Sequence, residues 1–335
     1  MSTWYKETDA YKGIIISSRV RLARNLADMP FPRRMTDEMF FDLRNRVREA
    51  VIKLSDNINL DLKFIEMNNV PDNEINAMVE RHVISPDFAQ HCKDRAIAIS
   101  SDESISIMIG EEDHIRIQVI SAGNSLDEAY SLADMIDTEL NENLGFAYDS
   151  KLGFLTECPT NIGTGLRASV MLHLPVSESR GEIATISDAA GKIGLTVRGM
   201  YGEGSKAAAS LYQISNQVTL GISEKNAVEN LKVIADQIVE REKQSRVALD
   251  KLELEDTVYR ALGTLKFARL LSSEEFMKHI SMIKLGVDEG IITNDNIKPI
   301  ELLIEAQPYM LMKKHSATSP LERDEARARM VREII

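Results

Sequence analysis

The sequence contains little of what would place the protein outside the cell or in a membrane. Only 2 of its 335 residues are cysteines, which is too few for a disulfide framework or a cysteine-rich zinc site. The first ten residues, MSTWYKETDA, include no apolar segment of the kind that a secretory signal needs. No apolar run approaches the roughly 20 residues of a membrane span. We therefore expect a protein of the reducing cytoplasm that contacts no membrane.

Basic residues are also fewer than acidic residues. The chain has 40 Lys and Arg residues against 52 Asp and Glu residues, a formal net charge of -12. General nucleic-acid binders gain affinity by neutralising phosphates, so this balance argues against a nucleic-acid partner and against a DNA-binding regulator. It leaves room for a local basic pocket. With 44% apolar residues, a chain of this length is expected to form a sizeable core and two domains.

Strand and helix patterns alternate in the first two-thirds of the chain. Residues 13–25, 104–120 and 167–174 alternate apolar and polar side chains as strands do, whereas 36–54 and 125–143 show helical spacing. Several strand patterns are adjacent in sequence. This favours an α+β fold, with a mainly antiparallel sheet flanked by helices.

The pattern becomes helical throughout after about Gly221. Residues 223–249 indicate one long charged helix, and Ser319-Pro320 is typical of the N-cap and first turn of a last helix. We place a domain boundary near Glu240. This predicts a mixed domain over residues 1–240 and an all-α C-terminal domain over 241–335.

Arginines recur on the predicted strands. Arg19 and Arg21 are two residues apart, so their side chains share one strand face. Two guanidinium groups so placed can bind two phosphates of one nucleotide, because their donors match phosphate oxygens. The alternative is a solvated strand face.

The segment EEDHIR combines carboxylates with an arginine. If the strand continues through it, Glu112, His114 and Arg116 lie on its polar face. Phosphoryl transfer to a basic acceptor needs such a pair: a carboxylate holds and deprotonates the nucleophile while an arginine neutralises the transferred group. The flanking Glu111 and Asp113 point the other way, so a single metal cage is not expected, and contact with Mg²⁺ through water is favoured. An exposed charged turn is the alternative.

Two glycine-containing segments follow. Residues 157–167 (ECPTNIGTGLR) form a predicted loop with Cys158 near its start and Arg167 at the beginning of the next strand. Residues 197–206 (VRGMYGEGSK) supply Arg198 and Glu203. The second segment has Gly-Ser-Lys where a phosphate-binding P-loop has Gly-Lys-Ser/Thr, so we reject a P-loop. Plain surface connections are the alternative for both.

The last predicted helix carries Arg323 and Arg327 four residues apart, on one helix face. Such a pair could bind an anion, or it could belong to a solvated helix of mixed charge.

Four strings, SSRVRLARN, EEDHIRIQ, CPTNIGTG and RGMYGEG, occur in the order of the active-site segments of the guanidino kinase (phosphagen kinase) superfamily, which the chain resembles. In creatine- and arginine-type members a helical domain precedes the first of these segments. Here that segment starts near the N-terminus, and a helical extension follows the last one. This layout, with RDEARA at Arg323 to Ala328, resembles the bacterial protein arginine kinase family.

The resemblance implies a role for each matching residue. Glu112 would orient the acceptor guanidinium and take its proton, Glu203 would be a second carboxylate on it, and Cys158 would contact one of its nitrogens. Glu111 and Asp113 would help hold Mg²⁺ through water, with no direct protein ligand. The ATP phosphates would be surrounded by Arg19, Arg21, Arg116, Arg167 and Arg198. Phosphoarginine would be bound away from the active site by Arg323, Asp324, Arg327 and Ala328.

The implied function is ATP-dependent and Mg²⁺-dependent phosphorylation of arginine side chains in proteins, by direct in-line transfer. A kinase of free arginine and a phosphoarginine-binding adaptor without catalysis are the alternatives. The expected partners are proteins with exposed or unfolded arginines, an activator protein and an ATP-dependent protease system of the stress response, and a second copy of the chain in a homodimer. The superfamily's adenine-side histidine is replaced by Met171, with His173 nearby, so adenine contacts stay unassigned.

Overall fold

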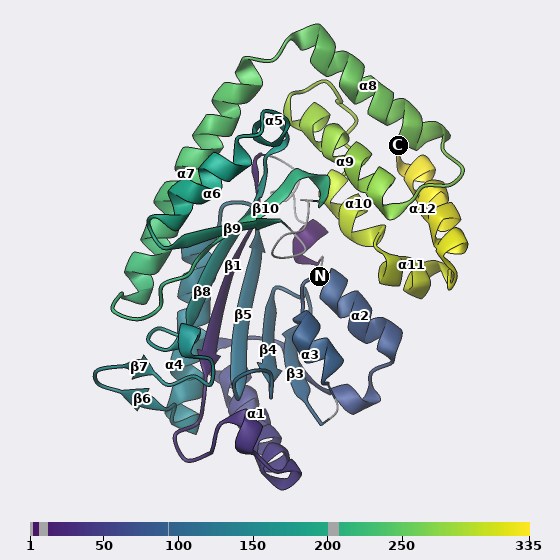
Figure 1. The fold of residues 1–335 in the computed structure, drawn as a ribbon. Helices are drawn as coiled ribbons and strands as arrows, with labels where there is room; N and C mark the ends of the chain where they lie inside the picture. Colours follow the sequence, from purple (N-terminus) through teal and green to yellow (C-terminus); the bar gives the residue numbers. More distant parts are fainter. Residues whose placement is uncertain (1–2, 7–12, 93, 200–207) are drawn as a thin grey trace.

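A computed structural model describes residues 3–6, 13–92, 94–199 and 208–335. At its centre lies an eight-stranded sheet in which every neighbouring pair of strands is antiparallel (Figure 1). In their order across the sheet, the strands are β2 (Leu62–Glu66), β3 (Ala96–Ser100), β4 (Ile105–Ile109), β5 (Ile115–Ala122), β1 (Ile15–Arg24), β8 (Leu166–His173), β10 (Leu211–Asn216) and β9 (Leu195–Gly199). A short hairpin of β6 (Tyr148–Asp149) and β7 (Gly153–Phe154) stands apart.

One face of the sheet is apolar and covered by helices. Val20 and Leu22 of β1 and Ile117 of β5 are fully buried there, and each such side chain stabilises the fold by about 1.5–3 kcal/mol. The helices that pack on this core are α1 (Asp37–Ile58), α4 (Leu126–Leu144), α6 (Ile183–Gly191) and α7 (Glu224–Val247).

The opposite face of the sheet is polar at its centre and covered at both ends. At one end, α2 (Asp72–Glu80) and α3 (Pro86–Gln90) bury a separate apolar cluster against β3 and β4. At the other end lies the C-terminal domain (Figure 1). Residues of the sheet, of α2 and of the C-terminal domain together line a cavity between these two covers.

The C-terminal domain is built from helices that share a second core with one end of the sheet. Ile16 of β1 and Leu211 of β10 belong to this core together with Trp4. The helices of this domain are α8 (Lys251–Phe267), α9 (Ser273–Asp288), α10 (Pro299–Glu305), α11 (Pro308–His315) and α12 (Pro320–Ile334). The short helix α5 (Pro175–Ser179) of the first domain contacts α9. Residue 240 lies inside α7, whose buried residues pack on the first core, so we propose to move the predicted boundary to residues 248–250. No described helix is both long and apolar enough to cross a bilayer.

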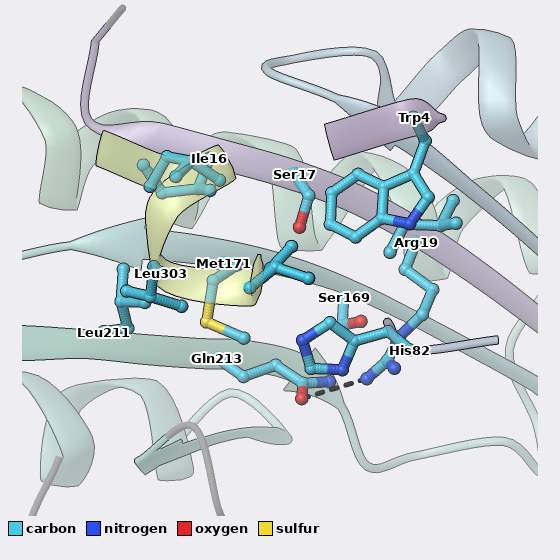
Figure 2. Close-up of a pocket in the computed structure, with 13 residues that line it drawn as sticks. Trp4, Ile16, Ser17, Arg19, His82, Ser169, Met171, Leu211, Gln213 and Leu303 are labelled. Atoms are coloured by element: carbon cyan, nitrogen blue, oxygen red, sulfur yellow. Dashed lines mark hydrogen bonds between the residues drawn. The ribbon is translucent and has the colours of Figure 1, made fainter. Parts of the chain in front are cut away.

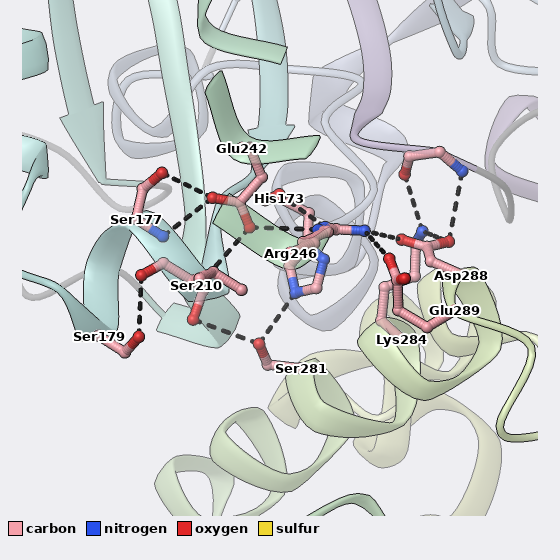
Figure 3. Close-up of polar contacts among 12 residues, drawn as sticks. His173, Ser177, Ser179, Ser210, Glu242, Arg246, Ser281, Lys284, Asp288 and Glu289 are labelled. Carbon is pink, nitrogen blue, oxygen red and sulfur yellow. Dashed lines mark hydrogen bonds and ion pairs between the residues drawn. The ribbon is translucent and has the colours of Figure 1, made fainter. Parts of the chain in front are cut away.

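A buried ionic network fastens the two domains (Figure 3). Arg246 of α7 contacts Glu242 (3.2 Å) and Asp288 of α9 (3.1 Å), and its guanidinium also donates to the carbonyl of His173 (3.3 Å). Glu242 accepts hydrogen bonds from the main-chain N–H groups at the start of α5. Because each of these buried charges has a partner, removal of one member would leave another buried charge uncompensated.

The predicted antiparallel α+β fold with an all-α C-terminal domain is confirmed, and so is the last helix with Ser319 as its N-cap and Pro320 in its first turn. The continuous strand over 104–120 is wrong. Residues 110–114 form a tight connection between β4 and β5, in which Gly110 has a φ of 79°. A glycine adopts this left-handed conformation without steric cost.

Candidate functional site

The sheet register places the predicted arginines on its polar face. Arg21 lies opposite Arg167 of β8, and Arg19 lies opposite Ser169; opposed residues of an antiparallel pair project to the same side. Arg116 and Arg198 reach this face from β5 and β9. All five predicted phosphate-binding residues line one cavity of about 400 Å³: Arg19, Arg21, Arg116, Arg167 and Arg198.

This cavity is electrostatically prepared for an anion. Burial, followed by the like charges of Arg116 and Arg167, lowers the pKa of Arg19 to about 10. Burial and the neighbouring arginines also depress the pKa of Arg21, and the buried Nε of Arg21 has no hydrogen-bond partner among the described residues. Buried donors without acceptors are costly, so a phosphate ligand would relieve both the repulsion and the missing bond.

Other residues that line the cavity were not predicted from the sequence. His82, Ser85 and Gln307 come from the α2–α3 connection and the C-terminal domain, and Gln213 comes from β10. Figure 2 shows Gln213 accepting a hydrogen bond from Arg19 (3.0 Å), with His82 beside it. Nothing in the local sequence marks these residues, because only the tertiary packing brings them over the sheet.

A smaller cavity of about 140 Å³ adjoins the first. It is lined by the predicted carboxylates Glu111, Glu112 and Asp113 and by Cys158. Arg21, Arg116 and Arg167 line both cavities. The structure therefore places the arginines predicted to bind phosphate and the residues predicted to hold the acceptor around two cavities that share three arginines.

Glu111 and Glu112 have different surroundings. Glu111 is buried and contacts Arg116 and the Ser85 hydroxyl (2.7 Å). Burial opposes its charge, but Arg116 and the hydrogen bonds outweigh burial, so the pKa of Glu111 is lowered. Glu112 is exposed at the cavity rim. The prediction that Glu112, His114 and Arg116 share a strand face is wrong, because Glu112 lies in the turn before β5.

Asp113 and His114 hold this turn in place. Asp113 accepts hydrogen bonds from Asn25 (2.6 Å) and from the N–H of Glu157 (2.7 Å). Burial raises its pKa to about 6. His114 is fully buried, with Nδ1 accepting from the N–H of Leu26 (3.0 Å). These bonds fasten the carboxylate turn to the loop that carries Cys158.

Thr219 holds the Cys158 loop through hydrogen bonds to its main chain. The Thr219 hydroxyl donates to the carbonyls of Thr160 (2.9 Å) and Ile162 (2.8 Å). Gly163 packs directly against the Thr219 backbone at a φ of 115°, where a side chain would collide. Cys158 Sγ lies 3.0 Å from the Thr160 hydroxyl at the cavity edge. The loop geometry therefore fixes where the thiol points.

No group of three or more His, Cys, Asp and Glu side chains suited to hold a metal ion is found in the described ranges. A Mg²⁺ ion that is bound chiefly by phosphate oxygens and water would not need such a group. Glu111 and Asp113 both face the smaller cavity, and their contacts with Arg116 and Asn25 already occupy part of each carboxylate.

Some predicted residues lie elsewhere. Glu203 is outside the described residues. Arg323, Asp324, Arg327 and Ala328 are in α12, and Arg327 is fully buried with hydrogen bonds to the carbonyls of Leu271 (2.6 Å) and Ala306 (3.0 Å) and to Asp324 (2.8 Å). Met171 lines the larger cavity, whereas His173 is buried against Ser281 of α9 (2.9 Å).

Comparison with known protein families shows that the mixed domain of this chain is a guanidino phosphotransferase catalytic domain. The sequence profile described as "ATP:guanido phosphotransferase, C-terminal catalytic domain" matches residues 42–245. A taurocyamine kinase from Schistosoma mansoni has the same fold, with a TM-score of 0.61 and 25% identity over 80% of this chain and 39% of that duplicated chain. Lombricine kinase gives a TM-score of 0.59 at 21% identity, covering 74% of this chain and 71% of its own.

A second profile, "Protein-arginine kinase McsB C-terminal domain", matches residues 251–335. Relatives named protein-arginine kinase include one from Caldanaerobacter subterraneus, 43% identical over 96% of both chains. Another, from Clostridium kluyveri, is 45% identical over 99% of this chain and 98% of its own. The chain belongs to the protein-arginine kinase family, which confirms the resemblance seen in its sequence.

Proposed function

We propose that the protein is an ATP-dependent protein arginine kinase. The observation that carries this proposal is the junction of the two cavities, where Arg21, Arg116 and Arg167 separate the phosphate-binding side from Glu112 and Cys158. A γ-phosphoryl group at this junction would be neutralised by arginines while an acceptor guanidinium approaches from the carboxylate side. Phosphoryl transfer depends mainly on such positioning and charge neutralisation.

The donor side suits a triphosphate. The five arginines would surround its oxygens. Burial first, and then Arg116 and Arg167, lower the pKa of Arg19, and a bound phosphate would favour the charged form of this group. Mg²⁺ would add charge neutralisation on the phosphates, with Glu111 and Asp113 as outer carboxylates that act through water.

The acceptor side suits a guanidinium. This group is a poor nucleophile because it is protonated, with a pKa above about 12. Glu112 would orient it and take a proton from the attacking nitrogen, while Glu203 and Cys158 would fix the planar group. A new bond then forms between that nitrogen and the γ-phosphorus, the bond from this phosphorus to the bridging oxygen breaks, and ADP leaves. The transfer is direct and in line, without a phosphoenzyme.

Arg323, Asp324, Arg327 and Ala328 of α12 are proposed to bind phosphoarginine away from the active site. Support comes from the partial exposure of Arg323 and Asp324 next to the buried Arg327. An arriving phosphate would compete with the carbonyl partners of Arg327. The test is binding of free phosphoarginine to the wild type and to Arg323→Ala, measured by calorimetry; equal affinities would contradict the assignment.

The remaining proposals concern partners. α8 exposes a row of large apolar side chains, Leu252 (74%), Tyr259 (55%) and Phe267 (71%), which supports a homodimer through this helix. We further propose a cytoplasmic location, unfolded or arginine-exposing proteins as substrates, and an activator protein and an ATP-dependent protease of the stress response as partners. The dimer proposal is tested by light scattering. The wild type should have the mass of two chains and Tyr259→Glu the mass of one, and an unchanged mass in Tyr259→Glu would contradict a dimer through α8.

The kinase itself is tested by incubating the protein with ATP, Mg²⁺ and an unfolded arginine-rich protein, followed by mass spectrometry without acid, because the phosphorus–nitrogen bond is acid-labile. Phosphate on protein arginines, absent with Glu112→Gln, is the expected result. Phosphate on free arginine alone would point to a small-molecule kinase, and no transfer at all would point to an adaptor.

A further inference from the structure

Glu80, the last residue of α2, lies between the C-terminal domain and the larger cavity, which is the proposed ATP site and is called the nucleotide cavity below. It lines the cavity together with Arg19 and His82. Its two carboxylate oxygens accept hydrogen bonds from the N–H groups of Tyr309 (3.0 Å) and Met310 (2.9 Å), in the first turn of α11. One carboxylate therefore contacts both halves of the molecule.

The contact between α2 and α11 includes a second carboxylate, which does not face the nucleotide cavity. Glu74 of α2 pairs with Lys313 of α11 (2.5 Å) and with Arg81 (2.8 Å). It lines a different recess, at the β2 edge of the sheet. Glu74 is thus a matched control, because it holds the same two helices together from outside the site.

The charged groups around Glu80 leave it close to titration at neutral pH. Burial disfavours its charge, while the two N–H groups and the charges of Arg81 and Arg327 favour it, and the balance raises its pKa to about 7. On α11, Lys313 is engaged with Glu74. Across the cavity stand Arg19 and the other phosphate-side arginines. His82 is neutral in this range, since burial and Arg19 lower its pKa to about 4.

We propose that Glu80 is a positioning residue that links nucleotide occupancy to the seating of the C-terminal domain. The inference rests on the proposal that ATP binds in this cavity. A triphosphate in the cavity that Glu80 lines would add negative charge on the side of this carboxylate, and added negative charge favours the protonated acid. The acid holds the N–H groups of a helix start more weakly than the anion, because it loses the charge-assisted bonds and the attraction to the helix dipole. ATP binding thus takes up a proton and loosens the first turn of α11.

The test uses the full chain and two readouts. ATP affinity is measured between pH 6.5 and 8.0 for the wild type, Glu80→Gln and Glu74→Gln. Because ATP binding takes up one proton, the affinity of the wild type for ATP should fall by roughly 3- to 10-fold as the pH rises from 6.5 to 8.0, relative to the affinity of Glu80→Gln. Glu74→Gln should keep the wild-type slope. Glu80→Gln should also change KM for ATP more than kcat, whereas a merely structural defect would lower the active fraction at every pH.

Amide hydrogen exchange supplies the second readout. In the wild type, ATP should speed exchange at Tyr309 and Met310, and in Glu80→Gln exchange should be fast with or without ATP. If Glu80→Gln does not fold, Glu80→Asp serves instead; it should keep the pH slope while exchange rises. Two results would overturn the proposed role of Glu80 and leave the nucleotide site in place. One is the same pH dependence of ATP affinity in the wild type and Glu80→Gln, and the other is amide exchange in the wild type that does not change when ATP is added. Failure of the wild type to bind ATP would overturn the nucleotide site and this inference with it.

Discussion

Arg21 of β1 lies directly opposite Arg167 of β8, and both side chains line the junction of the two cavities. Like charges in opposed positions destabilise a sheet. The two strands tolerate the repulsion because their other faces bury Val20, Leu22 and Ala168 in the main core. The free protein therefore carries a local electrostatic cost that an anionic ligand removes.

Replacing Arg21 separates binding from stability. Arg21→Ala should weaken ATP binding about 10- to 100-fold, since a charge-assisted phosphate contact is lost. Without ATP, the free energy of unfolding should stay within about 1 kcal/mol of the wild type, because relieved repulsion offsets lost packing. Calorimetric titration and chemical denaturation measure the two effects. The surface residue Arg46, which pairs with Asp28, is the control: Arg46→Ala should change neither. A large loss of stability in Arg21→Ala would assign Arg21 a structural role instead.

Glu112→Gln should remove proton abstraction and leave nucleotide binding intact. The expected fall in kcat is about 10²- to 10⁴-fold, with an unchanged dissociation constant for ATP because Glu112 does not line the larger cavity. Rates are compared with those of Glu128→Gln, an exposed carboxylate of α4. Near-normal turnover in Glu112→Gln would remove Glu112 from the mechanism.

Arg24 differs from its neighbouring arginines because it is structural. It is fully buried, pairs with Asp137 (2.8 Å) and Glu224 (3.1 Å), and stacks on the Phe154 ring at 3.5 Å. Arg24→Met should cost about 3–5 kcal/mol of unfolding free energy at pH 8, since two carboxylates lose their partner.

The cost of Arg24→Met should also depend on pH. Burial already raises the pKa of Asp137 and of Glu224, and loss of Arg24 would raise both further. A folded-state pKa above the unfolded value means that the folded protein binds the proton more tightly, so stability is recovered as pH falls. Urea denaturation at pH 8 and pH 5 should show a smaller penalty at pH 5. A penalty that is independent of pH would contradict this account.

Two glycine-to-alanine changes should have opposite effects. Gly163→Ala would place Cβ against the Thr219 carbonyl in a left-handed backbone, which should cost at least about 1–3 kcal/mol and displace the Cys158 loop. Gly263, inside α8, has open space around it, so Gly263→Ala should stabilise by about 0.5–1 kcal/mol. Thermal unfolding and the turnover number measure the pair; unchanged activity in Gly163→Ala would show that the loop tolerates displacement.

The sequence was sufficient to predict that Arg19 and Arg21 lie together on one face of the sheet. Arg19 and Arg21 share a strand face by spacing alone, and the period of two residues survives folding because β1 is a regular central strand. The two-residue alternation gave a wrong prediction at residues 110–114, where it indicated a continuous strand. Isoleucines on both sides of this segment keep the alternation in phase, so a hairpin and one long strand give the same pattern.

The parts of the site that sequence reasoning missed depend on long-range packing. His82 and Gln307 reach the cavity because α2 and α10–α11 cover the two ends of one sheet face. The buried state of Arg327 was missed for a similar reason: helical spacing shows that Arg323 and Arg327 share a face, but not that carbonyls of other segments occupy it.

The position of β1 in the sheet has a consequence for synthesis. β1 is made first, yet its neighbours are β5 and β8, the second of which ends at His173. Pairing of strands far apart in sequence is slow and requires closure of long loops. A chain emerging from the ribosome therefore leaves one edge of β1, the strand that carries Arg19 and Arg21, without its β8 partner until about half of the chain has been translated. Nascent copies of this protein are consequently inactive and expose a strand edge, the state in which pairing with another chain has to be avoided.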